Sequence, residues 1–213
     1  MSCAICETRR PRRFCPGVRG EICSLCCGTE REMTVDCPLT CEYLQEARKR
    51  EKPVELDPAQ IPDKDIQVSE KFVTEHEPLM VYLGSALAKA AFETPGAVDY
   101  DVREALDSLI RTYRTLVSGV FYESLPANLL AAQIHRSMQQ AIAEFVGEER
   151  QRFGMTRTRD ADVLGLLVFL RRIELDRNNG RRRGRAFLDA LREFYSVESG
   201  SPAPVPSSSL ILP

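Results

Sequence analysis

The sequence predicts a mainly α-helical protein, in which a small N-terminal cysteine-rich module precedes an all-α bundle of four or five helices. All eight cysteines of the 213-residue chain lie between Cys3 and Cys41. From about Ser69 to Tyr195 the apolar residues follow helical spacing, and no strand-like alternation interrupts them. The composition, 43% hydrophobic and 28% charged, is that of an ordinary globular protein and excludes wholesale disorder, a collagen-like chain and a coiled-coil rod.

Changes in composition divide the chain into four parts. Residues 1–50 form the cysteine-rich module and residues 51–68, with three prolines and five acidic residues, form a linker. Residues 69–198 form the helical bundle, and residues 199–213 a tail rich in Ser and Pro that we expect to be mobile. A bundle of this size can bury a core unaided, whereas a module of 50 residues usually needs an additional constraint.

The spacing of the cysteines indicates metal binding. Two residues between a pair of cysteines allow a tight turn to aim both sulfurs at one ion, and tetrahedral zinc takes four such ligands. Eight thiolates make two zinc sites with none left over. We expect interleaved sites: the first holds Cys3, Cys6, Cys23 and Cys26, and the second holds Cys15, Cys27, Cys37 and Cys41.

The interleaved assignment separates the adjacent Cys26 and Cys27, whose side chains diverge too much to serve one ion easily. Exchanging these two cysteines between the sites fits the spacing equally well. A tandem assignment, with Cys15 in the first site, also uses all eight cysteines but breaks the Cys23–Cys26 pair. A single zinc ion, redox-active thiols and an iron–sulfur cluster are the other possibilities.

Three segments carry a resemblance to known families. Cys-Ala-Ile-Cys, Arg-Phe-Cys-Pro and Ile-Cys-Ser-Leu-Cys resemble the interleaved two-zinc fingers of the HIT and MYND type, which implies a role in protein–protein contacts. The chain differs from those families in lacking a second cysteine soon after Cys15 and a late histidine ligand. The segments from Cys26 to Glu32 and from Asp36 to Leu44, together with the helical half, also resemble an uncharacterised bacterial family, which implies no activity.

Four long apolar stripes and one short stripe predict the helices of the bundle. The first begins at Phe72, with Pro78 either in its first turn or at a kink, and ends at Thr94-Pro95-Gly96. The second begins near Asp101, which forms a capping box with Glu104, and ends at Gly119. We expect Phe121 and Tyr122, just after this helix, to pack in the bundle.

The last three helices follow from the same reasoning. The third helix carries apolar residues from Leu130 to Phe145. The fourth runs from about Asp160 to Asp176, and its centre is apolar on all sides, which predicts a helix buried in the middle of the bundle. A fifth, short helix carries Phe187, Leu191 and Phe194.

An arginine-rich corner lies between the last two helices. The candidate anion-binding residues are Arg177, Arg181, Arg182, Arg183 and Arg185. Guanidinium groups bind phosphate or carboxylate through paired hydrogen bonds, so this corner could bind an anion or nucleic acid. The simpler interpretation is a solvated face with ion pairs to nearby acids. A second set of arginines lies within the module, where some of them could donate hydrogen bonds to the metal-bound sulfurs.

Neither the histidines nor the carboxylates form a catalytic motif, and we predict a protein that is not an enzyme. The leading hypothesis is a zinc-binding interaction or adaptor protein whose partner is a protein. The alternatives are a regulator that binds nucleic acid and a thiol/zinc redox switch. We find no signal peptide and no membrane span, and we infer no small-molecule substrate. The expected location is therefore the cytoplasm, where cysteines favour metal binding over disulfides.

Overall fold

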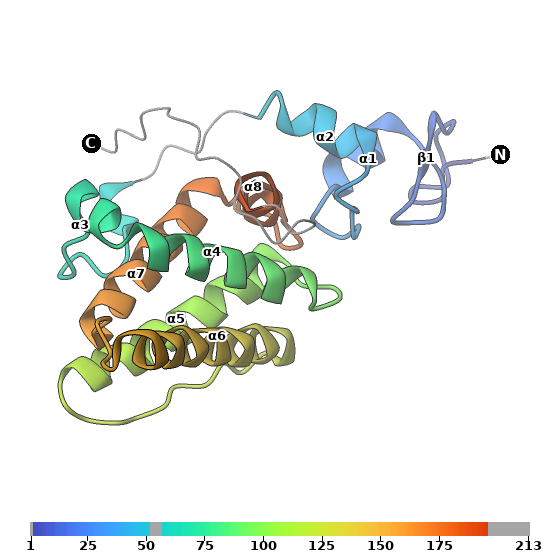
Figure 1. Ribbon diagram of the computed structural model, residues 1–213. Helices are drawn as coiled ribbons and strands as arrows, with labels where there is room; N and C mark the ends of the chain where they lie inside the picture. Colours follow the sequence, from blue (N-terminus) through green and yellow to red (C-terminus); the bar gives the residue numbers. More distant parts are fainter. Residues whose placement is uncertain (1, 52–56, 196–213) are drawn as a thin grey trace.

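The computed structural model describes residues 2–51 and 57–195, and the protein is mainly helical as predicted (Figure 1). The cysteine-rich module lies at one end of the molecule, next to the short last helix, and the long helices pack together beyond it (Figure 1). The predicted tail, residues 199–213, lies outside the described residues, as do residues 196–198 of the predicted bundle and residues 52–56 of the linker.

The module is built from a short hairpin and two short helices. Strands β1 (Arg13–Cys15) and β2 (Gly20–Ile22) pair in antiparallel register, and they are followed by helices α1 (Ser24–Glu30) and α2 (Glu42–Arg48). The hairpin was not predicted, because strands of three residues are too short to show an alternating pattern. Apart from cysteines, the side chains buried in the module are few, with Ile22 and Leu44 each 1% exposed. The module therefore has little hydrophobic core of its own.

The second half of the predicted linker is fastened to the bundle. Arg114 pairs with Asp63 at 2.6 Å and with Asp65 at 2.7 Å. Arg172 donates hydrogen bonds to the backbone carbonyl oxygens of Asp63 and Ile66, at 2.8 and 3.0 Å. These contacts thus hold residues 62–66 against the surface of the bundle.

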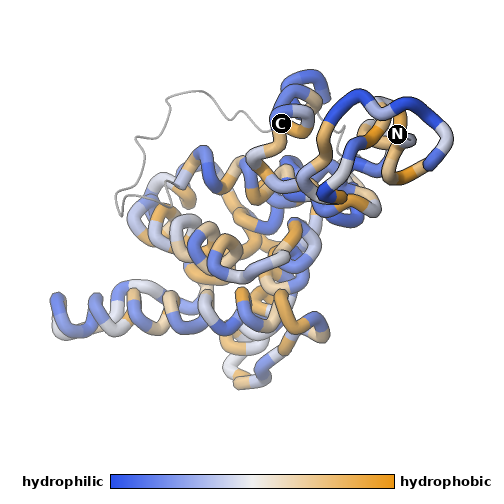
Figure 2. The backbone as a smooth tube through the Cα atoms, turned by 90° about the vertical axis from the view of Figure 1, so that its right-hand side faces the viewer, coloured by the Kyte–Doolittle hydropathy of each residue, from blue (hydrophilic) through white to orange (hydrophobic). Residues whose placement is uncertain are grey.

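The bundle contains four long helices and three shorter helical segments. In chain order the segments are η1 (Pro58–Gln60), α3 (Glu70–Glu75), α4 (Glu77–Phe92), α5 (Asp99–Val117), α6 (Leu129–Phe153), α7 (Asp160–Arg177) and α8 (Ala186–Phe194). Apolar residues concentrate where the helices face one another (Figure 2). Helix α7 is buried on all sides from Val163 to Val168, as its sequence predicted. It forms the centre of the bundle, packed against α5 and α8.

The first two predicted helices differ from expectation at their starts. The first is divided at His76 into α3 and α4, and Pro78 lies in the first turn of α4, where a missing N–H costs nothing. Helix α5 begins at Asp99, so Asp101 is its third residue rather than its cap. The Asp101 carboxylate accepts a hydrogen bond from the N–H of Val98 at 2.9 Å, which satisfies one donor at the helix start.

The prediction that Phe121 and Tyr122 pack in the bundle is wrong. Their exposed fractions are 75% and 68%. The loop between α5 and α6 is held to α5 through its backbone: the Tyr122 carbonyl accepts from Thr115, and the Ser124 N–H donates to Thr112. The two aromatic side chains therefore point into solvent. Among the residues described, no helix combines the length and apolar character needed to cross a membrane.

Candidate metal centre

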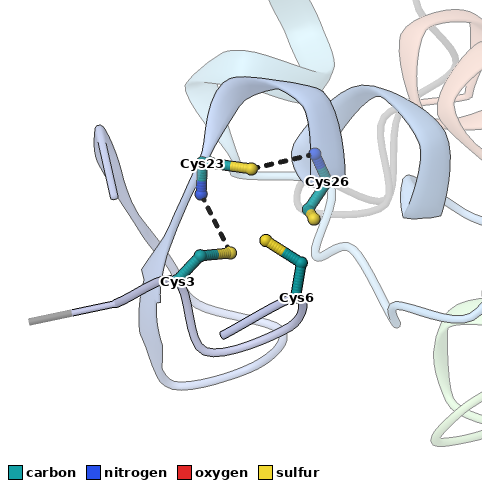
Figure 3. Close-up of side chains that lie close together, drawn as sticks. All are labelled: Cys3, Cys6, Cys23 and Cys26. Atoms are coloured by element: carbon teal, nitrogen blue, oxygen red, sulfur yellow. Dashed lines mark hydrogen bonds between the residues drawn. The ribbon is translucent and has the colours of Figure 1, made fainter. Parts of the chain in front are cut away.

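Four cysteines converge on one point in the module. The Sγ atoms of Cys3, Cys6, Cys23 and Cys26 all lie within 4.8 Å of one another and point towards a common centre (Figure 3). Within residues 2–51 and 57–195, no other group of three or more Cys, His, Asp or Glu side chains brings its ligand atoms this close. This group is the first of the two interleaved sets that the sequence predicts. Cys26 lies at this centre, whereas Cys27 of the exchanged assignment and Cys15 of the tandem assignment do not.

Backbone geometry holds these sulfurs in place. Cys3 and Cys6 lie on either side of a tight turn, closed by a hydrogen bond from the Glu7 N–H to the Cys3 carbonyl at 2.8 Å. Cys23 precedes α1, and its Sγ accepts from the N–H of Cys26 at 3.4 Å. The Sγ of Cys3 accepts from the N–H of Cys23 at 3.2 Å, which joins the two halves of the site.

Two of these thiols have pKa values shifted in opposite directions. Hydrogen bonds from Thr8 and from the backbone N–H of Arg9 lower the pKa of Cys6 to about 5. Burial and the neighbouring thiols raise the pKa of Cys26 to about 12. Four thiolates crowded together repel one another unless a cation lies between them. The arrangement therefore suits a metal ion that takes four sulfur ligands.

A centre of four thiolates is chemically closed. Tetrahedral zinc takes four ligands, and a catalytic zinc needs one of these positions free for water or substrate. With four cysteine sulfurs around one point, the arrangement suits a structural ion that holds the turn at Cys3–Cys6 against the start of α1.

The other four cysteines surround a separate small cavity. Cys15, Cys27, Cys37 and Cys41 all line a space of about 20 Å³. Cys15 ends β1, Cys27 lies in α1 directly after Cys26, and Cys41 immediately precedes α2. Because Cys26 and Cys27 are neighbours in one helix, their side chains leave it in different directions, one towards each group.

Two arginines of the module lie against this second group. The guanidinium of Arg13 is 3.7 Å from the Sγ of Cys27, and that of Arg31 is 3.8 Å from it. Arg13 also stacks over the ring of Tyr43, with 4.1 Å from the guanidinium carbon to the ring centre. Both guanidinium groups therefore lie where they can donate hydrogen bonds to the Cys27 sulfur.

One buried carboxylate, that of Glu32, makes several of the contacts between the module and the bundle. The Glu32 side chain is completely buried and contacts the loop that joins α7 to α8. It accepts hydrogen bonds from Arg48 at 2.7 Å, Asn179 at 2.9 Å and the N–H of Arg185 at 3.0 Å. The backbone carbonyl of Glu32 also accepts from the N–H of Arg183 at 2.7 Å.

The arginine-rich corner is to a large extent the surface that receives the module. Arg181 donates to the Arg31 carbonyl at 2.8 Å, and Arg185 pairs with Asp36 and donates to the Ala97 carbonyl at 2.9 Å. Arg177 lies apart, beside Asp176 at 3.3 Å. Arg182 and Arg183 are exposed. The guanidinium groups of Arg177, Arg181 and Arg185 therefore have partners within the protein, and anion binding by the five residues stays a prediction.

Sequence reasoning missed the residues that make this attachment. Glu32 lies in a segment that also contains Glu30 and Arg31, and nothing in that segment distinguishes a buried carboxylate from a solvated one. Arg48, near the end of α2, bridges Glu32 and Asp189 of α8. The available signal was the excess of arginine over acidic residues between α7 and α8. These arginines have no acidic partners nearby in the sequence, so their partners must come from another part of the chain.

Comparisons with protein-family models, with curated proteins and with solved structures found no match to this chain. The resemblances to two-zinc fingers and to a bacterial family stay predictions.

Proposed function

We propose that this protein is a non-enzymatic zinc-binding interaction protein, in which the module carries two structural zinc ions and docks a protein partner. The observation that carries the proposal is the convergence of the Cys3, Cys6, Cys23 and Cys26 sulfurs within 4.8 Å. Zinc is the common ion of four-cysteine structural sites. A module with so few buried apolar side chains gains from zinc the folding free energy that its core does not supply.

The second ion is supported by the cavity that the remaining four cysteines share. Cys15, Cys27, Cys37 and Cys41 come from β1, α1 and the segment leading into α2. An ion held by all four would join these three parts of the module. A second ion would also explain why Arg13 and Arg31 lie close to the Cys27 sulfur, since a zinc centre with four thiolates has a net negative charge.

The partner role is supported by apolar side chains that the module leaves exposed. Phe14, Leu25, Met33 and Tyr43 have exposed fractions between 39% and 57%. Phe14 and Tyr43 both border the second cysteine group. Exposed aromatic and methionine side chains are enriched at the centres of protein interfaces.

Metal analysis of the native protein by mass spectrometry tests the zinc assignment. We expect two zinc ions per chain, and one zinc ion in the Cys6→Ser and Cys27→Ser variants, because each substitution removes a ligand from a different site. The Ser24→Ala variant, which changes an exposed residue at the start of α1, keeps both ions. Protein without transition metal, or with its sulfurs joined as disulfides, would contradict the proposal.

A pull-down with the full chain tests the interaction role. A protein retained by the native chain and lost with Cys6→Ser supports the proposal. Binding to generic RNA or DNA that weakens steeply with salt would favour a nucleic-acid-binding regulator instead. Zinc release by mild peroxide, restored by a reductant, would favour a redox switch.

A further inference from the structure

A wide cleft lies where the module, the arginine loop (residues 178–185) and the starts of α5 and α6 meet. Its volume is about 640 Å³, within the range of small-ligand pockets. The module contributes Asp36 to its lining, the arginine loop contributes most of the charged side chains, and α5 contributes Tyr100 and Arg103. The cleft is separate from both cysteine groups.

The cleft is strongly basic. Its lining includes five arginines, Arg103, Arg181, Arg182, Arg183 and Arg185, and two acids, Asp36 and Asp101. Both acids are already engaged: Asp36 pairs with Arg185, and the 3%-exposed Asp101 accepts from Val98 and Asn128. The lining therefore has a net positive charge that its own carboxylates do not neutralise.

Two of these guanidinium groups are available to a ligand. Arg103 is held by Glu174 at 3.0 Å, and Arg181 donates to the Arg31 carbonyl. The exposed Arg182 and Arg183 side chains form no hydrogen bond or ion pair with the residues that the structure describes. Adjacent, unengaged arginines at the edge of a cleft are the donors that phosphate groups recruit.

The loop that carries these arginines is fixed before any ligand arrives. The Asn178 side chain accepts from the N–H of Gly180 at 2.6 Å, and the Asn179 side chain accepts from the N–H of Arg181 at 3.1 Å. Gly184 lies too close to the Asn179 side chain for a larger residue, because a Cβ at this position would be 2.5 Å from the Asn179 Oδ1 atom. A preformed loop reduces the entropy lost on binding.

Two apolar side chains and one aromatic ring also line the cleft. Val98 and Leu130 are half-buried, and Tyr100 is 56% exposed at the start of α5. A ring in this position can stack on a flat group such as a nucleobase. The cleft thus combines phosphate donors with a surface for an aromatic or apolar group.

We infer that this cleft binds a phosphate-bearing small molecule of nucleotide size. Arg182 and Arg183 hold the phosphates, and Tyr100 contacts the organic part. A polynucleotide fits less well, because the whole chain has a net charge of −2 and a pI of about 5.9, whereas nucleic-acid binding typically uses an extended basic face. The lining of the cleft contains none of the eight cysteines.

Isothermal titration calorimetry with ADP and with inorganic pyrophosphate on the full chain tests this inference. We expect both to bind, with affinity that falls as salt rises from about 50 to 200 mM. The double variant Arg182→Ala/Arg183→Ala weakens both at least about tenfold, because hydrogen bonds to a charged ligand are lost. Tyr100→Ala weakens ADP and leaves pyrophosphate unchanged.

A matched control removes the same charge elsewhere. Arg136 and Arg150 are exposed on α6, outside the cleft, and the Arg136→Ala/Arg150→Ala variant binds both ligands as the native protein does. Circular dichroism confirms that each variant is folded. The inference is overturned if neither ligand binds at millimolar concentration, or if both double variants lose affinity equally. It is also overturned if a single-stranded RNA oligonucleotide binds more tightly than ADP and is not displaced by it.

Discussion

At the scale of single residues, Glu32 has the greatest structural consequence outside the cysteines. It occupies a left-handed backbone position, with φ of 53°, and its side chain is completely buried. A buried carboxylate is stable only when cations and N–H groups surround it. Arg48, Asn179 and the backbone of Arg185 supply those donors. One carboxylate therefore aligns the module, α2 and the arginine loop.

The Glu32→Gln variant tests this role. Removing one charge from a buried ion pair costs about 3 kcal/mol, so the module should separate from the bundle more often. We expect trypsin to cleave after Arg181, Arg182 or Arg183 at least about tenfold faster than in the native protein, because opening exposes the loop. Glu21→Gln, which changes an exposed residue of β2, is the control. Equal cleavage rates in the two variants would show that Glu32 does not hold the module.

At the scale of elements, the helices of the bundle are positioned by close contacts at two glycines. A Cβ at Gly165 of α7 would lie 2.6 Å from Cζ of Phe72 in α3. A Cβ at Gly84 of α4 would lie 2.1 Å from Cζ of Tyr195, which follows α8. The absence of a side chain at these two positions lets an aromatic ring approach the helix backbone. The ring of Phe72 thus packs α3 against α7, and the ring of Tyr195 packs the segment after α8 against α4.

Alanine should lower the free energy of unfolding where it replaces a closely packed helical glycine, and raise it where it replaces a helical glycine with open space beside it. Gly165→Ala displaces Phe72 and lowers the free energy of unfolding by about 1–3 kcal/mol. Gly147→Ala, in α6, meets no atom within 4 Å and should raise it by about 0.5–1 kcal/mol, because glycine weakens a helix. Urea unfolding followed by circular dichroism measures both. A stabilised Gly165→Ala variant would show that Phe72 does not pack where the structure places it.

At the scale of the whole molecule, the cysteine groups and the arginine cleft are physically connected. Glu32 and Asp36 lie between Cys27 and Cys37, which border the same cavity, and both contact the arginine loop. The order of the cysteine-rich segments therefore determines the shape of one wall of the cleft. The core of the bundle, with Leu87, Leu109 and Leu167 fully buried, includes no residue of that segment.

Hydrogen exchange with and without a strong zinc chelator tests this division. After chelation we expect amides of residues 2–51 and 178–185 to lose protection, because the N–H groups of Arg183 and Arg185 donate to Glu32. Amides in the centres of α4, α5 and α7 keep their protection, since their hydrogen bonds lie within the bundle. Adding zinc back should restore the first set. Uniform loss across the bundle would show instead that module and bundle unfold as one unit.

The sequence by itself determined the features that depend on nearby residues. The spacing of Cys3–Cys6 and Cys23–Cys26 identified two tight turns, and the apolar period identified the bundle helices, including the buried centre of α7. Both signals are local: a turn or a helical face is defined within a few residues. The start of α5 was placed near Asp101 rather than at Asp99, because Asp101 and Glu104 have the spacing of a capping box. The three-residue strands gave no periodic signal.

Only the tertiary structure decided how the arginines are used and where the cleft lies. Glu32 is 147 positions from Asn179 and 153 from Arg185 in sequence. Which charges meet across such separations is set by the packing of the helices between them, and a charge pattern alone does not show it. The same run of arginines therefore fitted both an anion-binding surface and a solvated face with ion pairs to nearby acids. Folding divides it, with Arg181 and Arg185 holding the module and Arg182 and Arg183 facing the solvent.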